Sequence, residues 1–169
     1  MRKIYFAGKF NKIKDKTLSL EAQLENDYRS KLLGSSKLLT YANNNLVVDN
    51  KYIYQGPFYC EQASTGDYTS TDCNTVINAE YKAICDSDMV LVVFDEDFSV
   101  GSVVELGWAI NQDKEIIILY KEEASQYEIK SEYWFAIADA LKRSQNIEVY
   151  RYEKQDDVQQ VIKRILEEK

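Results

Sequence analysis

Two continuous apolar runs constrain the fold of this chain more than any other feature. Residues 89–94 (MVLVVF) and 115–120 (EIIILY) lack the apolar–polar alternation of a half-buried strand. Such runs are typical of strands that are buried on both faces of a parallel sheet. Residues 102–112, which lie between them, carry apolar side chains at helical spacing. Strands that alternate with helices predict a doubly wound α/β fold.

The other segments complete a flavodoxin-like, mostly parallel five-stranded sheet with helices on both faces. Residues 4–7 predict its first strand and residues 147–150 its last. Residues 41–75 predict an insertion, with a strand–turn–strand β-ribbon over 46–54 and a loop over 61–75. The apolar spacing predicts further helices over residues 17–39, 76–85, 133–143 and 156–169.

Missing residue types exclude several chemistries. The chain has no histidine, so it holds no Ser-His-Asp triad, no Cys-His dyad and no histidine-ligated metal. Its three cysteines form no Cys-x-x-Cys pair, which favours reduced thiols and a cytoplasmic location. No run approaches about 18 apolar residues, so we expect no membrane-spanning helix and no membrane partner. We expect one domain over residues 1–169, with neither a metal nor an organic cofactor.

Charge is distributed unevenly along the chain. The formal net charge is −7, which argues against general binding of nucleic-acid polymers. Residues 1–40 nevertheless hold nine Lys or Arg against four Asp or Glu, a balance of +5. This basic segment suits a small anionic ligand, or else Lys12, Lys14 and Lys16 form a solvated helix entry. Neither GxGxxG nor GxxxxGK[ST] occurs, which argues against a dinucleotide-binding fold and a P-loop NTPase.

The fold class predicts where a ligand would bind. In an open α/β sheet the ligand lies beyond the carboxyl ends of the strands, so residues 8–11, residues 95–101 and the 61–75 loop should meet there. Glu105 follows in the helix that begins at this edge. From residue types alone, Ser102 and Glu105 also fit a capping box, in which the glutamate serves the helix start.

The sequence around Glu105 resembles the nucleoside 2-deoxyribosyltransferase family. Asp88 precedes an apolar strand, residues 101–109 (GSVVELGWA) match the family element G-x-x-x-E-L-G-x-A, and Lys114 precedes the next strand. Residues 4–8 (IYFAG) are also similar to the start of the family. The resemblance implies a flavodoxin-like enzyme that cleaves the N-glycosidic bond of (deoxy)nucleosides or nucleoside 5′-monophosphates.

The resemblance also implies two catalytic residues. Glu105 matches the family nucleophile, and a carboxylate that attacks the anomeric carbon divides the displacement into two steps through a glycosyl-enzyme ester. Glu80 stands where the family often has an aspartate that orients the nucleophile or handles the proton of the leaving base. The alternative for Glu80 is an exposed helix carboxylate.

Ser99 stands six residues before Glu105, at a position that separates two subclasses of the family. The nucleoside transferases have an aspartate there for the sugar 5′-hydroxyl, and the 5′-monophosphate N-glycosidases have a phosphate-binding serine. We therefore expect Ser99 and Gly101 to hold the 5′ end of the sugar, together with Lys9 or Lys12 from the basic first segment, and Gly8 to contact the substrate as well. The alternative for Ser99 is a polar residue at a helix entry. After Gly8 the sequence KFNK replaces the Gly/Arg-rich segment of those hydrolases.

Further contacts follow from the same resemblance. Tyr5 matches an early family tyrosine near the site, or else it is a core aromatic residue. Family sites are completed by a neighbouring subunit, and Ser131 lies in the matching segment, which implies a homodimer or higher homo-oligomer. A surface helix cap is the alternative for Ser131. Tyr54 and residues 56–59 would offer an aromatic face to the base.

These observations predict that the protein cleaves a nucleobase–sugar bond in a small-molecule nucleoside or nucleotide. The sugar would pass through a covalent glycosyl-glutamate intermediate to another base or to water. Two alternatives stay open. One is a non-catalytic nucleotide-binding or sensing module, and the other is an NAD glycohydrolase.

Overall fold

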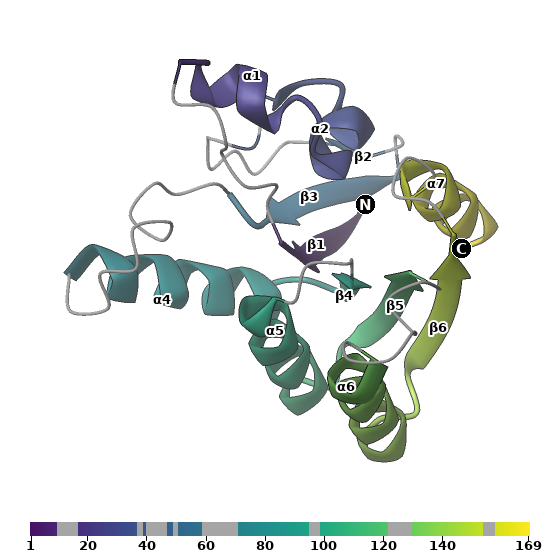
Figure 1. Cartoon of the computed structure of the whole chain (residues 1–169). Coiled ribbons are helices and arrows are strands. Elements are labelled where there is room, and N and C mark those ends of the chain that lie inside the picture. The colour runs from purple at the N-terminus through teal and green to yellow at the C-terminus, as the bar shows by residue number, and fades with distance from the viewer. Residues whose placement is uncertain are drawn as a thin grey trace.

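The chain forms an α/β structure of six strands and six helices in its described part (Figure 1). The computed structural model describes residues 1–9, 17–36, 39, 47–48, 51–58, 71–94, 99–121, 130–153 and 158–169. The strands are β1 (Arg2–Gly8), β2 (Val47–Val48), β3 (Tyr52–Gly56), β4 (Met89–Phe94), β5 (Glu115–Lys121) and β6 (Ile147–Tyr152). The helices are α1 (Leu20–Leu24), α2 (Tyr28–Leu33), α4 (Thr71–Cys85), α5 (Val100–Asn111), α6 (Lys130–Arg143) and α7 (Val158–Glu168).

One sheet with the strand order β2-β3-β1-β4-β5-β6 runs through the molecule. The five strands from β3 to β6 in this order are parallel to one another, which confirms the predicted fold class. Only β2 is antiparallel among the strands of the described residues, and it pairs with β3. The predicted ribbon therefore exists, but its second strand is also the fifth parallel strand, since β3 pairs with β1.

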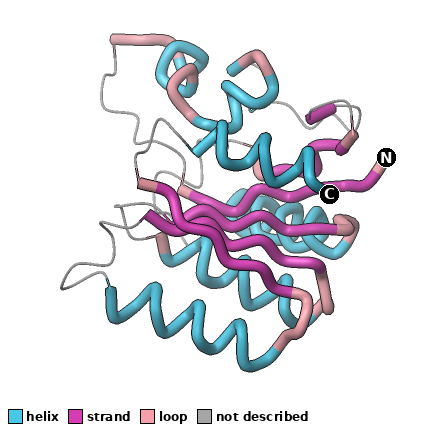
Figure 2. The backbone as a smooth tube through the Cα atoms, turned by 90° about the vertical axis from the view of Figure 1, so that its right-hand side faces the viewer, coloured by secondary structure: helices cyan, strands magenta, loops and turns pink. Residues whose placement is uncertain are grey.

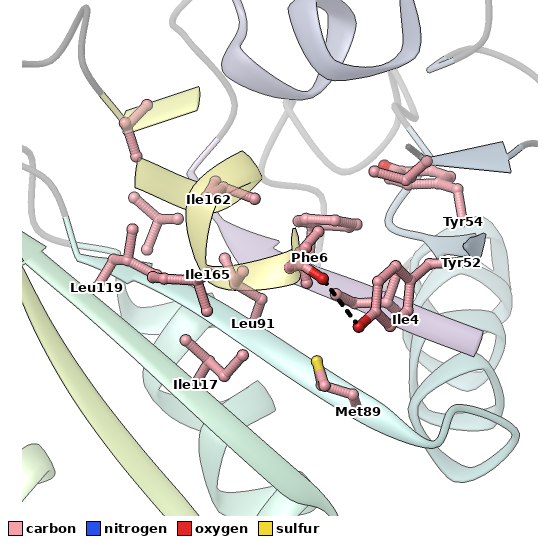
Figure 3. Packing of buried hydrophobic residues seen from close by; sticks show 14 of the residues in the cluster. Ile4, Phe6, Tyr52, Tyr54, Met89, Leu91, Ile117, Leu119, Ile162 and Ile165 are labelled. Carbon is pink, nitrogen blue, oxygen red and sulfur yellow. Dashed lines mark hydrogen bonds between the residues drawn. The ribbon is translucent and has the colours of Figure 1, made fainter. Parts of the chain in front are cut away.

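Helices cover both faces of the sheet, as Figures 1 and 2 show. Helices α4, α5 and α6 pack on one face, where Tyr5, Val90 and Ile118 point. Helices α1, α2 and α7 pack on the other face. There Ile162 and Ile165 of α7 approach the central strands, as Figure 3 shows. All six residues of β4 are buried, as its continuous apolar run predicts.

The predicted helix over residues 17–39 is wrong, because the chain forms two short helices there. The first ends at Leu24, and the second begins after Asp27, whose backbone is extended. The Asp27 carboxylate accepts a hydrogen bond of 2.9 Å from the Arg29 main-chain N–H, so it caps α2 and interrupts the helix. Gly34 ends α2 in the left-handed region, at a φ of 73°.

The two helices that flank β4 also differ from their predicted bounds. Helix α4 begins at Thr71, whereas the sequence analysis predicts a loop up to residue 75. Helix α5 begins at Val100, and its N-cap is Ser99. The earlier start of α5 places Glu105 in the second turn of the helix, where it faces the sheet.

Candidate active site

Glu105 and Tyr5 form a buried pair between α5 and β1. Glu105 is 8% exposed, and Tyr5 is fully buried. The Tyr5 hydroxyl donates a hydrogen bond of 2.5 Å to Oε1 of Glu105. The pair forms because α5 packs against β1 and turns the same face inward that buries Leu106 and Ala109. The structure thus brings together two residues that the sequence analysis singles out separately.

The prediction of a capping box formed by Ser102 and Glu105 is wrong. Oγ of Ser99 accepts the Ser102 main-chain N–H at 3.3 Å, so Ser99 caps the helix one turn earlier. The Glu105 carboxylate binds Tyr5 and takes no part in the helix start. Because burying a carboxyl group costs free energy, and Glu105 does not cap the helix, a role at the helix start does not explain the burial of Glu105.

Burial is the main cause that raises the pKa of Glu105 from 4.5 to about 8. The hydrogen bond from Tyr5 and the positive charge of Arg29 lower this pKa, whereas the nearby carboxyl group of Glu80 raises it. At pH 7 about one molecule in ten therefore carries the carboxylate form. Burial and the neighbouring Glu105 also raise the pKa of Tyr5, which stays a hydrogen-bond donor across the physiological range.

Glu80 lies in α4, the helix that packs against α5. It is half-buried, so the alternative of an exposed helix carboxylate is wrong. Burial raises its pKa, and the charge of Arg29 lowers it. The carboxyl group of Glu80 in turn raises the pKa of Glu105, which is the more deeply buried of the two.

Arg29 is a residue of this site that the sequence analysis misses. It is fully buried, and its Nε and Nη2 atoms bind the two carboxylate oxygens of Asp27 at 2.8 and 2.9 Å. The other N–H groups bind main-chain oxygens at the end of β1, namely those of Phe6 (3.2 Å), Gly8 (3.0 Å) and Lys9 (3.0 Å). The polar pair Asn26-Asp27 was the available signal, because such residues favour helix caps over helix interiors.

Gly8 and Lys9 occupy the carboxyl end of β1, as predicted. A Cβ atom on Gly8 would lie 3.2 Å from the Tyr28 hydroxyl and 3.5 Å from the Val93 Cβ, so the strand end has little room. Lys9 follows, with its carbonyl held by Arg29. Since β1 and β4 are parallel, this is also the edge at which α5 begins.

Ser99 and Gly101 form the start of α5. The Ser102 hydroxyl donates a hydrogen bond of 2.9 Å to Oγ of Ser99, and the Ser99 N–H donates one of 3.2 Å to the Tyr133 hydroxyl. Ser99 is therefore a polar residue at a helix entry, which was the alternative interpretation of its position in the sequence. Gly101 is exposed, and among the described residues a Cβ atom there would meet only Oγ of Ser99, at 3.9 Å.

Gly56 supports the position of Tyr5. Its φ of 132° suits only glycine, and a Cβ atom there would lie 3.2 Å from Cε2 of Tyr5. Tyr54, two residues earlier, is 1% exposed, stacks on Phe6 and donates a hydrogen bond of 2.5 Å to the Pro57 carbonyl. The prediction that Tyr54 offers a face to the base is therefore wrong, because its ring belongs to the core.

Some predicted contributors lie outside the described residues. Ser131 lies in the first turn of α6, but its side chain is not among those described. Neither the main chain nor the side chains of residues 10–11, 59–70 and 95–98 are described, and these residues include most of the predicted ligand-binding loops.

The two residues that flank the strands in the matched sequence have structural contacts. Asp88 accepts a hydrogen bond of 2.7 Å from the Lys3 main-chain N–H and donates its own N–H to the Lys3 carbonyl at 2.9 Å. Lys114 donates hydrogen bonds to the carbonyls of Cys85 (2.6 Å) and Ser87 (2.7 Å) at the end of α4. Both residues lie at the amino ends of the strands, opposite the edge where α5 begins.

Two further features bear on what the described residues can bind. They contain no group of three or more His, Cys, Asp or Glu side chains that could hold a metal ion. No helix within the described ranges is both long and apolar enough to cross a membrane.

The fold and the site together define a flavodoxin-like α/β protein with a buried glutamate–tyrosine pair between its first strand and the helix after β4. Among solved structures, it is similar to the CMP N-glycosidase BcmB of Clostridium botulinum, with 18% sequence identity and a TM-score of 0.56. That match covers 97% of this chain and 99% of BcmB, and at this identity it supports the shared fold. A conserved protein from Enterococcus faecalis V583 is 15% identical over 98% of this chain and 99% of its own, with a TM-score of 0.45. No family model and no curated protein sequence matches this chain.

Proposed function

We propose that this protein cleaves the N-glycosidic bond of a nucleoside or a nucleoside 5′-monophosphate, with Glu105 as the nucleophile. The observation that carries this proposal is the buried hydrogen bond between Tyr5 and Glu105. It holds one carboxylate oxygen in place and leaves Oε2 to attack. The full-length likeness to a CMP N-glycosidase, together with the E-L-G element at Glu105, supports the same reaction.

In the first step, Oε2 of the Glu105 carboxylate would bond to the anomeric carbon while the bond from that carbon to the base nitrogen breaks. The transition state resembles an oxocarbenium ion, so an adjacent negative charge stabilises it. The Tyr5 hydroxyl favours the carboxylate form of Glu105, because its hydrogen bond lowers the pKa of this group. The product is a glycosyl-glutamate ester and a base that carries the electron pair of the broken bond.

Glu80 is suited to give the leaving base its proton. Burial raises its pKa, so a larger share of molecules keeps the proton near neutral pH than for an exposed glutamate. In the second step, a water molecule or another base would attack the anomeric carbon and release the Glu105 carboxylate. If water attacks, the Glu80 carboxylate takes up its proton, and the site returns to its starting state.

The start of α5 is suited to hold the 5′ end of the sugar. Oγ of Ser99 accepts two hydrogen bonds, from the N–H and the hydroxyl of Ser102, so its own hydrogen can be donated to a ligand. The helix start attracts a negative charge, and the side chain of Lys9 would add a positive one. Gly101 is exposed and has no side chain, so a ligand can come close to its main chain.

Base release from a panel of nucleosides, nucleoside 5′-monophosphates and NAD, with and without a free acceptor base, tests this proposal. Chromatography should detect free base with the wild-type protein and none with Glu105→Gln. The matched control is Glu168→Gln, which makes the same chemical change at an exposed residue of α7 and should leave the rate unchanged. Mass spectrometry of the acid-quenched protein should find the sugar ester in the wild type.

The panel also separates the alternatives. Exchange of the base only with an acceptor identifies a transferase, and release without one identifies a hydrolase. Nicotinamide from NAD would identify an NAD glycohydrolase. Thermal stabilisation by a nucleotide without release of any base would contradict the proposal and favour a nucleotide-binding module.

A further inference from the structure

The end of β1 has an unusual neighbour, because β3 stops before β1 does. The Lys3 carbonyl accepts the Asp88 N–H, so the main-chain groups of Lys3 face β4. Main-chain groups alternate in direction along a strand, so the carbonyls of Phe6 and Gly8 face the β3 side. The pairing with β3 ends at Tyr5 and Gly56, which leaves both carbonyls beyond the last strand partner.

Beyond the end of β3, the guanidinium group of Arg29 supplies the hydrogen-bond donors that a neighbouring strand would otherwise supply. It donates to the carbonyls of Phe6, Gly8 and Lys9, and the bonds to Asp27 use its remaining N–H groups. All five N–H donors of the side chain are thus engaged. A lysine could not do this, because its single nitrogen cannot span three carbonyls and a carboxylate.

Burying the ion pair of Arg29 and Asp27 costs free energy, because both charges lose their contacts with water. Both Arg29 and Asp27 are at most 1% exposed, and an apolar pair of similar volume would often be at least as stable. An apolar pair would, however, leave the carbonyls of Phe6, Gly8 and Lys9 without their donor, so the ion pair has a structural role here. The charge acts on the two glutamates, because it lowers the pKa of Glu105 and that of Glu80.

We propose that Arg29 is a positioning residue of the glycosidic site: its hydrogen bonds fix the end of β1 at the 5′ end of the substrate and hold a positive charge beside the strand that carries Tyr5, the hydrogen-bond partner of Glu105. This role rests on the proposed function. Four groups act on or respond to Glu105 from the elements around it, namely Tyr5 on β1, Tyr54 on β3, Glu80 on α4 and Arg29 on α2. Arg29 is the only cation among these four, so no other member of the set can replace its effect.

Two variants separate the two parts of this role. Arg29→Lys keeps a positive charge but loses the contacts to the carbonyls. The double variant Asp27→Asn with Arg29→Gln removes both charges, so it leaves no buried charge unpaired. Carbon-13 NMR of the glutamate carboxyl groups, with Glu105 assigned by its absence in Glu105→Gln, measures the titration of Glu105 without any substrate. Base release measures kcat and KM separately.

In the double variant, the titration midpoint of Glu105 should move to higher pH, because the Arg29 charge that lowers the pKa of Glu105 is lost. The loss of the Asp27 charge offsets part of this shift, so the shift should be smaller than the roughly one unit expected for the loss of a lone opposite charge. The acid limb of kcat/KM should move with it. In Arg29→Lys the midpoint should stay near that of the wild type, while KM should rise about tenfold. A merely structural role would lower stability without moving the midpoint.

A midpoint that stays in place in the folded double variant would overturn the electrostatic part, and an unchanged KM in Arg29→Lys would overturn the positioning part. If the double variant does not fold, a titration of the wild-type protein tests the electrostatic part instead. The nitrogen-15 signal of Arg29 Nε should titrate with the Glu105 midpoint and should not do so in Glu105→Gln. If the wild type releases no base, the proposed function fails, and the two titrations still support or overturn the effect of Arg29 on Glu105.

Discussion

Replacing Glu105 with glutamine should stabilise the protein, and the gain should grow as the pH rises. The pKa of Glu105 is about 8 in the folded protein and 4.5 as its ordinary value. Between these values the folded state holds a proton that the unfolded chain has lost. The free energy of unfolding therefore falls as the pH rises through this window. Glutamine stays neutral and escapes this loss.

The size of the effect follows from the same two pKa values. At about 1.36 kcal/mol per pKa unit, the whole window corresponds to roughly 5 kcal/mol, and the part below pH 7 to roughly 3 kcal/mol. The stability difference between Glu105→Gln and the wild type should thus be smallest near about pH 4.5. It should grow by roughly 3 kcal/mol at pH 7 and by roughly 5 kcal/mol near pH 9.

Urea unfolding at several pH values, followed by circular dichroism, measures this difference. Glu168→Gln is the control, because it makes the same chemical change at an exposed residue of α7. A flat difference for Glu105→Gln between about pH 5 and 9 would refute the reasoning, since it would mean that Glu105 titrates like an exposed carboxyl group. The expected result would also show that loss of base release in this variant is not caused by unfolding.

Three further substitutions test the surroundings of Glu105. Tyr5→Phe should lower kcat/KM for base release by roughly 10- to 100-fold and move its acid limb to higher pH, because it removes a hydrogen bond that lowers the pKa of Glu105. An unmoved acid limb would contradict this role. Gly56→Ala should lower the free energy of unfolding by about 1–3 kcal/mol, since its φ of 132° disfavours alanine and the new Cβ would press on Tyr5. Urea unfolding measures this loss. Lys114→Met should cost about 1–3 kcal/mol of stability, because two carbonyls at the end of α4 lose their donor, while kcat/KM stays unchanged. A drop in kcat/KM at full stability would place Lys114 in the site instead.

The parallel sheet could be predicted from the sequence because its central strands are encoded locally. The apolar runs of β4 and β5 need no knowledge of their neighbours to be identified as buried strands. The double role of β3 could not be predicted in this way. Whether a strand pairs on one side or on both depends on contacts with β1, which lies some 50 residues earlier in the chain.

The pairing of Tyr5 with Glu105 could be anticipated only through the family resemblance. The two residues are 100 positions apart, and no local pattern links them. Residue types alone favoured a capping box at Glu105, and that preference fails because Ser99 starts the helix one turn earlier. Arg29 was missed for a related reason. In a continuous helix it would have been one more surface cation, whereas the cap at Asp27 turns it inward.

The charges around Glu105 bear on how a 5′-monophosphate would be accommodated. A carboxyl group with a pKa of about 8 is mostly protonated at pH 7, and a phosphate dianion bound nearby would raise that pKa further. Arg29 offsets part of this effect at Glu105, but its five N–H groups are already engaged by Asp27 and three carbonyls. In the proposed function, direct contact with a phosphate would therefore come from Lys9 and the start of α5. In the proposed function, Arg29 would lower the pKa of Glu105, whereas Lys9 and Ser99 would bind the phosphate of a 5′-monophosphate substrate.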